Sequence, residues 1–152
     1  MDSRPDTYEH KGQVAGLVLG VAADLTRRAA VHDDSKLQEP ERACFDEYTE
    51  KLADTTYDSP EYREHLKGMQ VGLDHHYSVN DHHPEHHPGG VGDMNLIQIM
   101  EMLCDWIAAT RRHADGDIHR SIDQNAERFG YGEELRCMLH NTVDALLAAE
   151  LP

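Results

Sequence analysis

The chain has 152 residues, 39% of them hydrophobic, which is enough for one compact domain with one core. Its formal net charge of −15 repels nucleic-acid backbones and anionic membranes, which argues against duplex binding. The sequence lacks both a long apolar run and a signal peptide, so we expect a cytoplasmic protein with no membrane span.

The histidines of the sequence indicate metal binding, whereas its cysteines do not. Three widely spaced cysteines, Cys44, Cys104 and Cys137, favour buried thiols over a disulfide framework or a cysteine zinc site. The chain has 12 histidines, a clear excess, and they form no terminal tag. Histidine is the commonest metal ligand near neutral pH, so the excess indicates metal binding.

The first half of the chain has helical periodicity. Apolar residues at spacings of three and four predict a helix from Thr7 to Ala30, with His10 on its inward face. Pro40 suits the first turn of a second helix that continues to Leu52, and Thr55–Pro60 is a predicted loop. A third helix is expected over Pro60–Tyr77.

The second half alternates loops with helices. Ser78–Gly92 is a predicted loop, because it is rich in proline, glycine and histidine. Further helices are predicted over the ranges 94–113, 118–128 and 133–150, with a turn at 114–117. No segment alternates with period two, so we predict an all-α bundle of five to seven helices. It forms a single domain over residues 1–152 with frayed ends at 1–6 and 150–152.

Four residues drawn from three separate predicted helices suggest a mixed nitrogen and oxygen metal site. They are His10, the adjacent pair His32 and Asp33, and Asp105. Such a set suits one or two ions of Mn, Fe, Co, Ni or Zn, with Mg as an alternative. A bound ion would activate water as a nucleophile.

A second histidine cluster lies between residues 75 and 87. One or two of its members would complete a second metal position, and a solvated polar loop is the alternative interpretation. The helix face favours His76 over His75, whereas His82 and His83 are candidates jointly.

The order His10, His32-Asp33, Asp105 resembles the H…HD…D signature of the HD superfamily, an all-helical group of metal-dependent phosphohydrolases that act mostly on nucleotides. The run from His32 to Lys36 resembles the HD-x-x-K form of its cyclic-dinucleotide phosphodiesterases. His76, His82 and His83 resemble the extra histidines with which those members hold two metals. The pieces 31–36, 80–85, 101–106 and 121–129 also resemble a small bacterial and phage family of this superfamily, which implies the cytoplasm of a bacterium or of a phage-infected host.

The sequence departs from the superfamily in two places, and each departure argues against a property of one of its branches. The deoxynucleotidase branch has a glutamate where Lys36 stands, so the role of that branch's catalytic acid is not assigned to this position. The Gly-Tyr-Pro motif of the cyclic-dinucleotide branch is absent, so that substrate is not favoured.

Roles for the remaining candidates follow from their chemistry. Lys36 is a predicted catalytic and phosphate-binding residue, with a solvated lysine as the alternative. Glu85 is a candidate general base or substrate contact, with an exposed loop residue as the alternative. Glu101 would orient a histidine ligand or pair with Arg112 or Lys36.

Three further positions complete the predicted substrate site. Asn80 is a predicted substrate contact, and Arg111 and Arg112 would bind further phosphates or be solvated. Trp106 is expected in the core, with stacking on a base as the alternative.

These observations leave three functions open. The first is hydrolysis of a nucleotide or related small phosphoester or phosphoanhydride by a metal-activated water. The alternatives are an HD-type di-iron oxygenase, and a module that binds a nucleotide or metal without turnover. Homo-oligomerisation through apolar positions of the last helix stays open; these positions are Leu146, Leu147 and Leu151.

Overall fold

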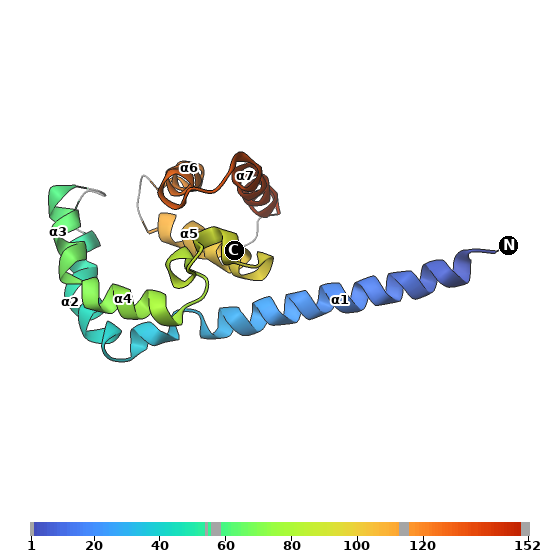
Figure 1. The fold of residues 1–152 in the computed structure, drawn as a ribbon, viewed down its shortest axis with the longest axis horizontal. Coiled ribbons are helices and arrows are strands. Elements are labelled where there is room, and N and C mark those ends of the chain that lie inside the picture. The colour runs from blue at the N-terminus through green and yellow to red at the C-terminus, as the bar shows by residue number, and fades with distance from the viewer. Residues whose placement is uncertain (1, 54, 56–58, 113–115, 150–152) are drawn as a thin grey trace. The chain divides into compact units, whose positions relative to one another are not determined.

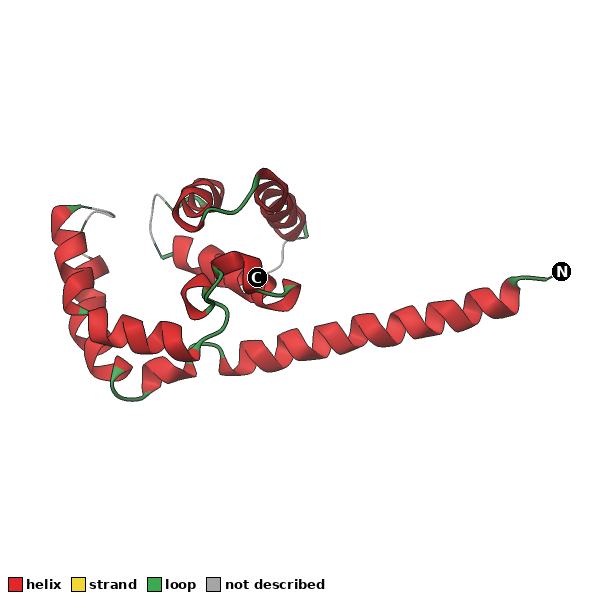
Figure 2. Cartoon of the chain, viewed as in Figure 1, coloured by secondary structure: helices red, strands yellow, loops and turns green. Residues whose placement is uncertain are grey.

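The computed structural model describes residues 2–53, 55, 59–112 and 116–149. Over these ranges the chain consists of helices and loops without a strand, as Figure 2 shows, so the all-α prediction is confirmed. None of the helices in these ranges combines the length and apolar character needed to cross a membrane. The chain divides into two units, residues 1–32 and 33–152, and the single domain expected over 1–152 stays a prediction.

The first unit is one helix, α1 (Arg4–Val31), which Figure 1 shows without interruption. It begins three residues before the predicted start, because Pro5 is tolerated in a first helical turn and Asp6 complements the helix dipole there. The residues 4–6, expected to be frayed, are therefore helical. The helix ends at His32, whose backbone leaves the helical region with φ −54° and ψ 126°.

The second unit starts with four short helices. They are the 3-10 turn η1 (Asp34–Leu37) and the α-helices α2 (Glu41–Ala53), α3 (Pro60–Gly68) and α4 (Gln70–Val79). α2 packs against η1, α3 and α4. The single helix predicted over Pro60–Tyr77 is thus two helices that meet at Met69, whose side chain is 1% exposed.

Glycines allow this part of the unit to pack closely. A Cβ on Gly68 would meet the hydroxyl end of the Tyr48 side chain, and one on Gly72 would lie 2.7 Å from Cys44 Cβ. The Cβ of Cys44 is fixed to the backbone of α2, so α4 approaches α2 this closely because residue 72 lacks a Cβ.

The predicted loop at 78–92 contains two 3-10 turns, η2 (Pro84–His86) and η3 (Gly90–Asp93). After it come α5 (Leu96–Thr110), α6 (Ile118–Phe129) and α7 (Glu133–Ala148), close to the predicted ranges. Asn95 and Gln98 form a capping box at the start of α5, and Gly130 ends α6 with φ 68°. The predictions for residues 54, 56–58, 113–115 and 150–152 lie outside the described residues.

The core of the second unit lies where α5, α6 and α7 meet. Its buried apolar residues are Leu103, Ile122, Leu139 and Val143, with Val91, Met94 and Met102 beside them. Trp106 packs against both groups, and its ring lies parallel to that of Phe129 with centroids 6.3 Å apart. Trp106 is therefore a packing residue, as the first of its two interpretations expected.

Candidate metal centre

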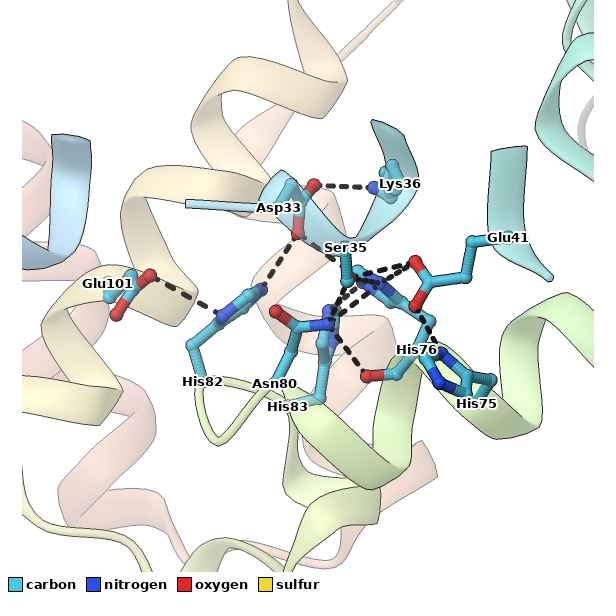
Figure 3. A network of polar contacts seen from close by, with 10 residues as sticks. All are labelled: Asp33, Ser35, Lys36, Glu41, His75, His76, Asn80, His82, His83 and Glu101. Carbon is cyan, nitrogen blue, oxygen red and sulfur yellow. Dashed lines mark hydrogen bonds and ion pairs between the residues drawn. The ribbon is translucent and has the colours of Figure 1, made fainter. Parts of the chain in front are cut away.

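Asp33 stands at the start of the second unit in the left-handed backbone region, with φ 59°. Aspartate tolerates this region better than most residues, so the sequence supports the turn that leads into η1. The two carboxylate oxygens of Asp33 have different neighbours, as Figure 3 shows. Oδ2 lies 2.5 Å from Lys36 Nζ, whereas Oδ1 lies 3.4 Å from His76 Nε2 and 3.5 Å from His82 Nε2.

Asp33 and three histidines bring four possible metal-ligand atoms within 4.8 Å of one another. The histidines are His76, from α4, and His82 and His83, from the loop that follows it. His76 Nε2 lies 2.9 Å from His83 Nε2. Atoms bonded to one metal at about 2.0–2.2 Å are themselves about 2.8–3.6 Å apart, so these separations fit a shared ion.

The buried carboxylate of Glu41, which is 0% exposed, fixes the ring of His76 from behind. His76 Nδ1 donates to Glu41 Oε2 at 2.8 Å, so the proton is on Nδ1 and the Nε2 lone pair faces Asp33 and His83. Glu41 also accepts from His75 Nδ1 at 2.7 Å and from Ser35 Oγ at 2.9 Å. His75 therefore supports Glu41 instead of joining the four-residue group, which agrees with the preference for His76.

A second carboxylate, Glu101 of α5, lies beside His82 at a longer distance. Glu101 Oε1 lies 3.4 Å from His82 Nδ1, and both side chains are at most 10% exposed. A carboxylate behind a histidine is the usual partner of a metal-binding imidazole, because it holds the ring and raises its basicity. Two of the three histidines thus have a carboxylate beside Nδ1, as metal-binding histidines usually do, and the orienting role of Glu101 stays a prediction.

The electrostatics favour the neutral forms of two of these histidines, His76 and His83. Burial, together with the neighbouring His82 and His76, lowers the pKa of His83 to about 3. Burial and then Lys36 lower the pKa of His76 as well. Burial raises the pKa of Glu41, but hydrogen bonds from His75, Ser35 and His76 together hold it below its usual value. Neutral imidazoles and an ionised carboxylate partner are the forms that bind a metal ion.

Asp105 and Asn80 lie beside the group. An oxygen of Asp105 lies within 4.8 Å of one of Asp33, so these two predicted ligands are brought together. The Asn80 amide donates to Ser35 Oγ and to the carbonyl of His76, both at 2.8 Å. Asn80 thus braces the turn around His76, and its predicted substrate contact stays a prediction.

Glu85 pairs with Arg128 of α6 at 2.7 Å, so it is a partner of that guanidinium in this structure. Arg111 and Arg112 are exposed at the end of α5. Their predicted phosphate contacts stay predictions.

His10 is not brought to His32. Both belong to the first unit, where one continuous helix separates them by 22 residues, or about 33 Å at about 1.5 Å per residue. The inward face expected for His10 has no partner within that unit, because a lone helix has no core. His32 is bonded directly to Asp33, and its role as a ligand stays a prediction from the sequence.

Glu41 and Ser35 are site residues that were not expected from the sequence, where Glu41 stands out only as an acid that favours a helix start. The sequence does contain a signal for a buried Glu41. The apolar stripe of α2 consists of Cys44, Tyr48 and Leu52, and Glu41 lies on the same helix face, three positions before Cys44. A carboxylate on a buried stripe indicates a polar partner inside the fold.

No curated protein and no solved structure matches the chain. A family model does match it, over residues 1–151, and its description is a family of unknown function, DUF5662. The chain therefore belongs to the DUF5662 family.

Proposed function

We propose that the chain is a metal-dependent phosphohydrolase that acts on a nucleotide or a related small phosphoester or phosphoanhydride. The observation that carries the proposal is the convergence of Asp33, His76, His82 and His83, with carboxylates behind two of the histidines. The order of motifs, which resembles that of the HD superfamily, supports the same reaction class.

The donor set fits a catalytic ion better than a structural one. Structural zinc sites are usually closed by cysteine and histidine, whereas this group contains no cysteine and mixes three imidazoles with a carboxylate. Imidazole and carboxylate together suit Mn, Fe, Co, Ni or Zn. A divalent ion held here would lower the pKa of a water molecule and so supply the nucleophile for hydrolysis.

The residues around the group have distinct tasks. Glu41 and Glu101 hold His76 and His82 in place through their Nδ1 atoms. Lys36 is the cation at the edge of the group and would contact a phosphate oxygen. A local positive charge is needed there, because the chain as a whole carries −15 and repels anions. Asp105, beside Asp33, would hold a second ion or a water molecule.

The test compares the full chain with two variants that are matched in residue type. His82→Ala removes a ring of the group, whereas His65→Ala removes a half-buried histidine of α3 that has its own carboxylate neighbour, Glu61. Each protein is purified without chelator and analysed for metal. It is then assayed for release of phosphate or pyrophosphate from a panel of nucleotides.

We expect the wild type and His65→Ala to hold metal in a fixed ratio and to release phosphate only with metal. His82→Ala should lose both properties while its circular dichroism stays helical. Metal binding without turnover of any nucleotide would replace the hydrolase with a binding module. Bound iron with oxygen consumption, and no phosphate release, would replace it with an oxygenase.

A further inference from the structure

The helix α1 has an apolar belt that its own unit cannot cover. From Val14 to Ala23, every residue is aliphatic or glycine, and charged residues lie on both sides of this stretch. Over residues 2–32 the first unit contains no second helix or strand, and none of the residues of α1 is buried. A helix that is apolar around its whole circumference normally packs against a neighbour, so the belt indicates a partner.

One face of α1 is arranged symmetrically about Leu17. In the centre of this face, Val14 lies three residues before Leu17 and Val21 lies four residues after it. Farther out, His10 and Asp24 are each seven residues from Leu17, and Asp6 and Arg28 are each eleven residues from it. At about 100° per residue, all of these side chains leave the helix within an arc of about 80°, so they share one face.

The spacing along this face is that of a coiled-coil seam. The steps from His10 to Val14, Leu17, Val21 and Asp24 alternate between four and three residues. The helix has 28 residues, or four heptads, and is about 42 Å long at about 1.5 Å per residue. Its length is therefore sufficient for a helix pair.

The charges make this face complementary to itself in one orientation only. In an antiparallel pair, two-fold symmetry places residues that are equally far from Leu17 opposite each other. Asp6 then faces Arg28 of the second copy, and His10 faces Asp24 of the second copy. A parallel pair would instead place each charged residue beside its own copy, and like charges in contact are unfavourable.

A contact that α1 already makes is compatible with the antiparallel pair. Asp24 Oδ1 accepts a hydrogen bond from Arg27 of the same helix. A carboxylate accepts several hydrogen bonds, so Asp24 can also accept one from an imidazole of a second helix.

We propose that α1 binds α1 of a second copy of this chain, in antiparallel orientation about a two-fold axis beside Leu17. Val14, Leu17 and Val21 of both copies form the apolar seam. Contacts between Asp6 and Arg28, and between His10 and Asp24, close the seam at each end. The pairing is independent of the proposed hydrolase activity, because the four residues that converge at the candidate metal centre all lie outside α1.

Analytical ultracentrifugation of the full-length chain over a range of concentrations tests the pairing. A chelator is present, so that metal ions do not bridge two copies. We expect a reversible dimer, and Leu17→Asp should weaken it about 10–100-fold because it places a charge at the centre of the seam. The matched control is Leu19→Asp, about 160° around the helix from Leu17, which should leave the dimer unchanged. Circular dichroism verifies that both variants stay helical.

A charge exchange tests the orientation. Arg28→Glu places a second acid opposite Asp6 and should weaken the dimer about tenfold, and adding Asp6→Arg should restore it. Lys11→Glu makes the same change of charge away from the face and should have little effect. A wild type that is monomeric at every concentration would overturn the proposal, as would a dimer that Leu17→Asp leaves intact. A dimer that depends on Leu17 but not on Arg28 would overturn the antiparallel orientation.

Discussion

His76 Nδ1 donates a buried hydrogen bond of 2.8 Å to Glu41 Oε2, and both side chains are at most 2% exposed. This contact joins the start of α2 to the last turn of α4 and decides which nitrogen of His76 is available. The proposed metal centre thus depends on a residue that contributes no ligand to it.

Glu41→Gln tests this dependence. Glutamine keeps the shape and one acceptor oxygen but removes the charge, so we expect metal affinity to fall about 10–100-fold. The metal-free variant should also lose about 1–3 kcal/mol of unfolding free energy, because donors from His75, His76 and Ser35 lose a charged acceptor. Titration calorimetry and urea unfolding measure the two effects. The matched control is Glu47→Gln, an exposed partner of Lys51, and equal effects in both variants would contradict the prediction.

Lys36→Met separates phosphate binding from metal binding. A charge-assisted contact contributes about 1.5–3 kcal/mol, so kcat/KM for a phosphorylated substrate should fall about 10–100-fold. Metal affinity should stay the same or rise, because Asp33 loses the cation that lies 2.5 Å from its Oδ2. Steady-state kinetics and metal titration give both values, with Lys51→Met as the control. A loss of metal binding in Lys36→Met would show that this lysine serves the structure of the site.

Gly72→Ala tests the packing that carries His76. A Cβ at Gly72 would lie 2.7 Å from Cys44 Cβ, so α4 must move away from α2. We expect a loss of about 1–3 kcal/mol in unfolding free energy, together with weaker metal binding. In contrast, a Cβ at Gly12 of α1 meets nothing within 4 Å, and Gly12→Ala should gain up to about 1 kcal/mol from helix propensity. Thermal unfolding with and without metal tests whether Gly72→Ala is less stable, and Gly12→Ala more stable, than the wild type.

Tyr131→Phe tests a pH dependence that arises in the core. The Tyr131 hydroxyl donates to the carbonyl of Ile122 at 2.7 Å, and burial, with a smaller effect of Asp123, raises the pKa of Tyr131 to about 12. A raised folded pKa means that the stabilisation is complete below the ordinary value of 10.0 and is lost as the pH rises toward 12. The wild type should exceed Tyr131→Phe by about 1 kcal/mol below pH 10, and this difference should shrink above it.

Urea unfolding of both proteins across this pH range measures the difference directly. The remaining tyrosines are common to both proteins, so their titration cancels. A difference that does not change with pH would show that the hydroxyl of Tyr131 ionises equally in the folded and unfolded chain.

Much of the fold could be predicted, because helix periodicity and end signals are local. The ranges of α6 and α7 follow from apolar spacing and from Gly130, which has the positive φ that ends α6. The break at Met69 was not predicted, because the apolar spacing of Leu66, Met69 and Leu73 continues through it without interruption.

The candidate site could also be predicted in part, because the residue types that bind metals and their positions are visible in the sequence. Asp33, His76, His82 and His83 were expected from residue type and position, and the structure brings them together. His10 was placed inward from periodicity alone, which gives the face of a helix but not what the face contacts. Glu41 was missed because a glutamate near a helix start has a sufficient local reason in the helix dipole.

The backbone of Asp33 is left-handed, with φ 59°. The residue that fits this conformation best therefore differs from the residue that the proposed metal chemistry needs. Glycine would adopt the same conformation without steric cost, so Asp33→Gly should relax the turn while it removes the carboxylate. Asparagine is the one neutral residue that keeps both an oxygen and a tolerance for positive φ, which makes Asp33→Asn the better probe of charge. Asp33→Asn should therefore keep the turn while it removes the charge that the proposed metal centre needs, whereas Asp33→Gly removes the side chain altogether.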